Sequence, residues 1–152
     1  MIKIFDFLCQ KAVTLEIKSR DKKGSISELI ELLLKEKKVK DSVKALNAVM
    51  EREKLGTTGV GQGVAIPHGR VDTVSELVGA FGISKQGIQF DSLDGEPVHL
   101  VFLLLSPPDS AGYHLRAIAR ISRLFKDKFF RQALLDATDV EEVLKIIRQE
   151  DE

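Results

Sequence analysis

Residues 56–69 read Gly-Thr-Thr-Gly-Val-Gly-Gln-Gly-Val-Ala-Ile-Pro-His-Gly, and the interpretation of the whole chain starts from this stretch. Four glycines within the eight residues 56–63 are incompatible with a helix, so we expect a loop or a very tight turn there. Residues 64–66 are apolar and predict a short strand, which Pro67 ends because proline has no N–H to donate. His68 is therefore expected at a strand end, where the backbone opens and leaves room for a partner the size of a phosphate.

The segments on either side of this stretch alternate between strand and helix patterns. Apolar and polar residues alternate over 13–17, as in a half-buried strand, and residues 77–84 read as another strand. A turn at residues 94–97 leads into residues 98–105, which are almost wholly apolar and predict a strand buried on both faces. Helices that precede and follow these strands favour an α/β fold with a layered sheet.

The helices are expected where apolar residues recur every three to four positions. One is capped by Asp41 or Ser42 and ends near Gly56, another begins near Ser110, and the last begins with a capping box at residues 138–141. The expected apolar faces are Ile26, Leu29, Ile30, Leu33 and Leu34; Val43, Leu46, Val49 and Met50; Ala111, Leu115, Ile118, Ser122 and Phe125; Ala133 and Leu134; and Val140, Val143, Leu144 and Ile147.

Composition narrows the class of protein. A chain of 152 residues fits a single domain, expected to span residues 1–152. Its 23 basic and 23 acidic residues balance, which argues against nucleic acid as a partner. The single cysteine, Cys9, fits a reducing compartment. Neither a signal peptide nor an apolar run of the ~20 residues needed to span a bilayer is visible, so we expect a cytoplasmic protein without stable membrane insertion.

The chain has three histidines, and two of them have more than one interpretation. His68 is either a surface turn residue or a reactive group beside the glycine-rich loop. His114 lies in the first turn of a helix, where the helix dipole lowers the pKa of an imidazole, or it is a partly buried packing residue. His99 opens a buried strand and is expected to bond a backbone carbonyl without taking part in chemistry. Arg52, near a helix C-terminus, is either a solvated cation or a fork of donors for phosphate.

The sequence lacks the motifs of several common nucleotide-binding, hydrolase and metal sites. No Gly-Lys-Ser/Thr follows the glycine-rich stretch, and neither a dinucleotide fingerprint nor Gly-x-Ser-x-Gly is present. The chain also lacks His-Glu-x-x-His and paired cysteines. We therefore expect no cofactor and no metal.

At this point the residues match a known family. Residues 53–69, with their Val-Ala-Ile-Pro-His-Gly core, resemble the active-site signature of enzyme IIA domains of the fructose/mannitol type, from the bacterial phosphoenolpyruvate-dependent sugar phosphotransferase system (PTS). The similarity continues through residues 90–100, His114 and residues 119–124. It implies the α/β fold of type-2 enzyme IIA domains, a mixed sheet with helices on both sides.

The resemblance also implies a phosphotransferase component. His68 would be phosphorylated, on Nε2, by the phosphocarrier protein HPr or a nitrogen-type paralogue of it. Arg52, Thr58 and His114 would surround the phosphoryl group. Independently of the resemblance, we expect apolar residues near His68, such as Val60, Val71 and Tyr113, to provide the contact area for partners.

Two physiological roles remain open from the sequence. The glycine-rich stretch and residues 93–100 look most similar to nitrogen-regulatory enzyme IIA proteins. That similarity favours a regulatory protein, in which the phosphorylation state of His68 decides which target proteins bind. The alternative is a sugar-uptake component that donates the phosphoryl group to a cysteine of a IIB domain. No attached IIB or IIC segment is expected in this chain.

Overall fold

The computed structural model describes all 152 residues, and one mixed six-stranded sheet runs through the chain. The elements, in chain order, are a 3₁₀ turn η1 (Ile4–Asp6), β1 (Leu8–Thr14), α1 (Lys22–Lys35), α2 (Ser42–Lys54), β2 (Gly59–Gly61), β3 (Val64–Ala65), β4 (His68–Arg70), β5 (Val78–Ile88), β6 (Val98–Ser106), α3 (Ala111–Phe125), α4 (Lys128–Asp136) and α5 (Val140–Glu150). No helix is long and apolar enough to cross a lipid bilayer.

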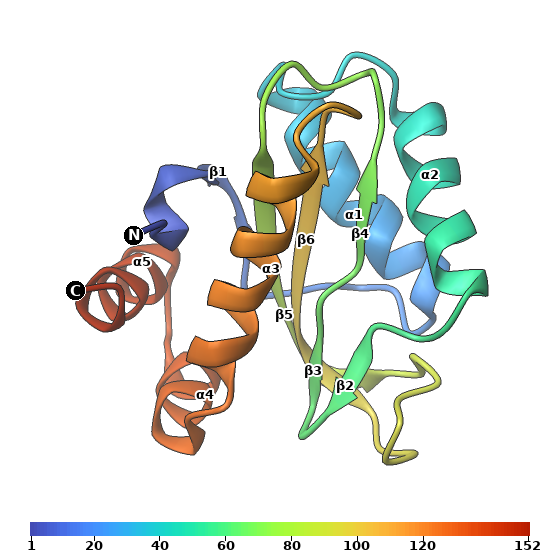
Figure 1. Cartoon of the computed structure of the whole chain (residues 1–152). Coiled ribbons are helices and arrows are strands. Elements are labelled where there is room, and N and C mark those ends of the chain that lie inside the picture. The colour runs from blue at the N-terminus through green and yellow to red at the C-terminus, as the bar shows by residue number, and fades with distance from the viewer.

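The sheet has the strand order β1-β5-β6-β3-β2, and β4 also pairs with β6. β5 and β6 form an antiparallel pair, whereas β1 runs parallel to β5 and both β3 and β4 run parallel to β6. Figure 1 shows α1 and α2 on one side of the sheet and α3, α4 and α5 on the other. The expected α/β class, with a mixed sheet and helices on both sides, is confirmed.

Two hydrophobic cores fill the two faces of the sheet. The core under α3, α4 and α5 contains 22 buried residues, among them Phe81, Phe102 and Phe125. The core under α1 and α2 contains 20, among them Leu29 and Val49. Side chains of a strand point alternately to opposite faces, so β6 contributes to both cores. This explains why residues 98–105 are almost wholly apolar, as the sequence pattern indicated.

The glycine-rich stretch contains a tight hairpin, so the second of the two expected forms, a loop or a very tight turn, is the one observed. β2 pairs antiparallel with β3, and the two connecting residues, Gln62 and Gly63, have φ angles of 58° and 79°. Two consecutive positive φ angles are the requirement of the type I′ turn that suits a two-residue hairpin. The Asp94 carboxylate holds this turn by accepting the N–H of Gln62 at 3.0 Å.

Several expected boundaries and faces need correction. β1 spans Leu8–Thr14 instead of 13–17, and Thr14 already ends it. The last helix is capped by Asp139, not Thr138, because the Asp139 carboxylate accepts the N–H of Glu142. On α3 the face that packs on the sheet consists of His114, Ala117, Ile121, Leu124 and Phe125, and on α2 it centres on Ala45, Val49 and Glu53. Leu115 and Val43, which were assigned to these faces, are 66% and 67% exposed.

Candidate functional site

β4 carries His68 and exists as a separate strand because of Pro67. Proline cannot donate to the ladder, so the chain breaks after Ala65 and resumes pairing with β6 at His68, opposite Leu104. His68 therefore begins a second short strand instead of lying where the backbone opens. Its Nδ1 lies 2.9 Å from the carbonyl oxygen of Ile66, which holds the imidazole in one orientation.

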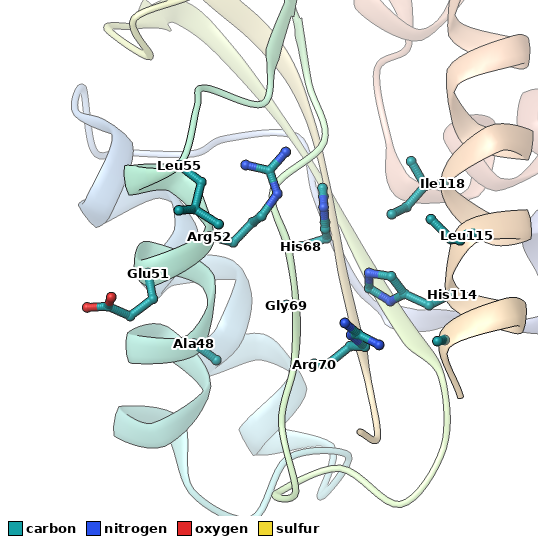
Figure 2. Close-up of a pocket in the computed structure, with 11 residues that line it drawn as sticks. Ala48, Glu51, Arg52, Leu55, His68, Gly69, Arg70, His114, Leu115 and Ile118 are labelled. Carbon is teal, nitrogen blue, oxygen red and sulfur yellow. The ribbon is translucent and has the colours of Figure 1, made fainter. Parts of the chain in front are cut away.

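A cleft of about 570 Å³ lies over β4, between α2 and α3. Its floor is formed by β4, with α2 along one wall and the first two turns of α3 along the other (Figure 2). The lining residues are Ala48, Glu51, Arg52 and Leu55 from α2; His68, Gly69 and Arg70 from β4; and Ala111, His114, Leu115 and Ile118 from α3. The exposed residues Ala111 and Leu115 and the partly buried Ile118 of α3 thus line the cleft.

Gly69 allows α2 to approach β4 closely. A Cβ atom at this position would lie 3.2 Å from the backbone nitrogen of Val49 and 3.3 Å from the carbonyl carbon of Ala48. These distances are tighter than ordinary contacts, and both atoms belong to the α2 backbone. The absence of a side chain at Gly69 therefore sets how near Arg52, one turn further along α2, comes to His68.

His114 reaches from α3 toward His68 and brings a second imidazole into the cleft (Figure 2). The two ring centroids lie 5.3 Å apart with an interplanar angle of 62°. The Nδ1 atom of His114 lies 2.5 Å from the Ser106 hydroxyl at the end of β6. Burial lowers the pKa of His114 from 6.5 to about 4, assisted by the proximity of His68 and Arg70. The expected lowering is present, but burial rather than the helix dipole is its first cause.

The pKa of His68 is also lowered, mainly because the ring is desolvated. The carbonyl of Ile66 opposes this shift, the positive charge of Arg52 adds to it, and the carboxylate of Glu53 opposes it. Both imidazoles are consequently neutral at neutral pH. Neutral imidazole has a free lone pair on one nitrogen and a proton on the other, so the cleft holds two rings that can each act as nucleophile or donor.

Arg52 occupies the last turn of α2 and lies beside His68 at the top of the cleft in the view of Figure 2. Its Nη1 donates to the carbonyl of Gly56 at 2.8 Å, which anchors one side of the guanidinium while the rest borders the cleft. Arginine carries five N–H donors in a fixed fork, so anchoring one leaves donors for an anion. The structure thus brings three of the four expected site residues together: His68, His114 and Arg52.

Thr58, the fourth expected residue, does not line the cleft. It is 5% exposed, and its hydroxyl donates to the carboxylate of Glu53. The same carboxylate accepts the backbone N–H of Thr58 and pairs with Lys22 Nζ at 3.0 Å. A direct contact of the Thr58 hydroxyl with a phosphoryl group remains a prediction, and it requires the hydroxyl to leave Glu53.

Sequence reasoning missed four residues around the site. Arg70 lies two positions after His68 on β4, and strand alternation could have placed both on one face. Ser106, Glu53 and Lys22 carry no local signal, because each acquires its role from a residue distant in the chain or on another element. His99 behaves as expected: its Nδ1 lies 2.7 Å from the carbonyl oxygen of Ser84, and it does not line the cleft.

Known proteins are similar to this chain in sequence and in fold. Residues 6–150 match the family described as "Phosphoenolpyruvate-dependent sugar phosphotransferase system, EIIA 2". A nitrogen regulatory protein from Bradyrhizobium diazoefficiens is 36% identical over 95% of this chain and 94% of its own length. The fructose-specific EIIABC component of the PTS from Bacillus subtilis is also 36% identical, over 99% of this chain, but the chain spans only 24% of that protein.

A solved structure agrees with these sequence matches. The crystal structure of the nitrogen regulatory protein IIA-Ntr from Neisseria meningitidis superposes with a TM-score of 0.85 at 36% sequence identity. The superposition covers 93% of this chain and 97% of that one. The sequence and the fold therefore point to the same set of proteins.

Proposed function

This chain belongs to the EIIA 2 family of the phosphoenolpyruvate-dependent sugar phosphotransferase system, and from that premise we propose that Nε2 of His68 is the atom that accepts the phosphoryl group. The chain is a phosphotransferase component of the PTS relay. The observation that carries the choice of atom is the contact between Nδ1 of His68 and the carbonyl oxygen of Ile66, at 2.9 Å. A carbonyl oxygen only accepts, so Nδ1 carries the proton and Nε2 keeps the lone pair.

The transfer step follows from this tautomer. The Nε2 lone pair attacks the phosphorus of phosphorylated HPr or a paralogue of it. The bond from phosphorus to the donor nitrogen breaks, and its electron pair stays on the donor imidazole. The proton on Nδ1 of His68 remains in its hydrogen bond to Ile66, where the carbonyl dipole stabilises the positive charge that the ring gains. The lowered pKa of His68 keeps the nucleophile unprotonated at neutral pH.

Three side chains around His68 can stabilise the transferred group. Phosphoryl transfer passes through a loose transition state, so positioning and charge stabilisation account for most of the catalysis. Arg52 supplies positive charge next to His68, Arg70 supplies it next to His114, and His114 supplies a neutral ring beside His68 (Figure 2). None of the three needs to give up a proton during the reaction.

Exposed apolar residues around the cleft provide contact area for protein partners. Leu55 on α2 is 85% exposed and Leu115 on α3 is 66% exposed, so they flank His68 from the two walls. Val60 is 52% exposed on the hairpin, as the proposed docking role needs. Val71, by contrast, is buried and packs in the core, so it is withdrawn from this surface. A dianionic phosphoryl group among these residues would change which partners bind.

For the physiological role we propose phosphorylation-dependent regulation in a nitrogen-type PTS. The support is the match to nitrogen regulatory proteins over nearly their full length, in sequence and in fold. The fructose-specific component from Bacillus subtilis, at the same 36% identity, supports the alternative of a sugar-uptake relay to a IIB cysteine. Both roles use the same first step at His68.

Labelling tests the acceptor. Incubation with phosphoenolpyruvate, enzyme I and HPr should add one phosphoryl group, stable in alkali and labile in acid, and NMR should place it on Nε2 of His68. His99→Ala is the matched control, because His99 lies outside the cleft, and it should be labelled like the parent. Undiminished labelling of His68→Ala would overturn the proposal, and so would attachment to Nδ1.

The regulatory and sugar-uptake roles can be distinguished by identifying the proteins that bind this chain or receive its phosphoryl group. Immobilised His68→Ala protein and fully phosphorylated parent protein should retain different non-transport proteins from a lysate if the role is regulatory. Rapid transfer to a purified IIB domain, together with sugar phosphorylation that strictly requires this chain, would favour the uptake role instead.

A further inference from the structure

Ser106 and His114 form a buried polar contact, and His114 lines the cleft. Ser106 is the last residue of β6 and is 0% exposed, and His114 is 6% exposed. Their side chains meet at 2.5 Å between Oγ and Nδ1. The Ser106 hydroxyl has no other hydrogen-bond partner in the structure, and its backbone carbonyl is occupied by the N–H of Val71 at 2.8 Å.

This burial decides which atom carries the proton. The Ser106 hydroxyl has one proton, and Nδ1 of His114 is the one acceptor within reach. If Nδ1 carried a proton and donated it to the hydroxyl, the hydroxyl proton would be buried without an acceptor, which costs about 1–3 kcal/mol. The favoured arrangement has the hydroxyl donating to a bare Nδ1, so the neutral ring carries its proton on Nε2.

We propose that Ser106 is a positioning residue that fixes His114 as the Nε2–H tautomer and so points an N–H donor at the place where a phosphoryl group on His68 would lie. This inference rests on the proposed function of His68. The lowered pKa of His114 supports it, because a neutral ring has two tautomers whereas a protonated ring donates from both nitrogens.

The two histidines then have opposite tautomers, each set by a different backbone or side-chain partner. The carbonyl of Ile66 leaves the lone pair of His68 on Nε2, and the hydroxyl of Ser106 leaves the proton of His114 on Nε2. Arg70, whose positive charge helps to lower the pKa of His114, cannot accept a hydrogen bond, so it does not compete for the Nε2 proton of His114. One ring is thereby prepared to attack phosphorus and the other to donate to its oxygens.

The direct test needs no variant and no phosphodonor. Nitrogen-15 NMR of the unphosphorylated parent protein at neutral pH should show His114 with a protonated Nε2 and a bare Nδ1, and the Ser106 hydroxyl proton should exchange slowly and couple to Nδ1. A protonated Nδ1 on His114 would overturn the proposal. This readout is independent of whether His68 accepts a phosphoryl group, so its failure is distinguishable from failure of the proposed function.

A double-mutant cycle tests the functional consequence. Ser106→Ala should slow phosphoryl transfer about tenfold in the parent background, because the donor on His114 is no longer held in place. The same substitution should have no further effect when His114 is already replaced by Ala, which leaves Ser106 no side-chain acceptor at that position. Equal slowing in both backgrounds would show that Ser106 does not act through His114. Circular dichroism of all four proteins confirms that the comparison is between folded chains.

Discussion

His114 should make the stability of this protein fall as the pH is lowered from neutral, by an amount that the structure allows to be estimated. Its pKa is about 4 in the folded protein, against 6.5 for the ordinary residue, because the ring is buried. Between these values the unfolded chain binds the proton more strongly, so the free energy of unfolding decreases as the pH decreases. The stabilisation is fully present above pH 6.5 and is lost as the pH falls through about 4.

The full difference corresponds to about 3 kcal/mol, of which about 2 kcal/mol should be lost by about pH 5. His114→Gln is the matched variant, since its amide oxygen can still accept from Ser106 but does not titrate. Urea unfolding of both proteins between about pH 7.5 and pH 5 isolates the contribution of His114, because carboxylates titrate in both alike. His68 shifts in the same direction and remains in both proteins.

The parent should therefore lose about 2 kcal/mol more than His114→Gln over this range. Equal losses in the two proteins would refute the argument that burial of a neutral imidazole controls this part of the pH dependence. An NMR titration that placed the His114 pKa near its ordinary value in the folded protein would refute it as well, and would identify the step that failed.

Three further outcomes follow from the geometry of the cleft. Arg52→Ala should slow phosphoryl transfer to His68 by ~10²–10³ in a quench-flow assay without changing the fold. The control Lys54→Ala removes a cation outside the cleft and should leave the rate within about twofold of the parent. Gly69→Ala should destabilise the protein by ~1–3 kcal/mol in urea unfolding and also slow transfer, because its Cβ would push against the α2 backbone; unchanged stability would contradict that packing. Arg70→Ala should raise the His114 pKa in an NMR titration, since the guanidinium contributes to lowering it; an unchanged or lower value would remove Arg70 from the electrostatics of the site.

The sequence alone was sufficient for the class of fold, and it named three residues that the fold brings into one cleft. Residues 98–105 could be assigned as a strand buried on both faces, because a strand between two helical layers has no solvent-facing side. His68, Arg52 and His114 lie together in the cleft, as their positions in the family signature implied. These features can be read from the sequence because hydrophobic periodicity and short motifs are local properties of the chain.

The folded structure alone decided how the polar groups are paired. The pairing of β3 with β6 places the β2–β3 hairpin in the sheet, and no local sequence pattern encodes that pairing. The Thr58 hydroxyl donates to Glu53 instead of facing the cleft, and Glu53 is itself neutralised by Lys22 from another helix.

The same holds for the protons on the two imidazoles. The sequence identified His68 and His114 but not their tautomers, since these depend on which acceptor or donor lies within 3 Å of each ring nitrogen. Ile66 is two residues from its histidine, whereas Ser106 reaches His114 only because β6 ends beneath the first turns of α3. The groups that surround each buried imidazole come from separate elements of the fold. They, and not the residue type, determine which ring nitrogen carries the proton and therefore whether that histidine can attack or donate.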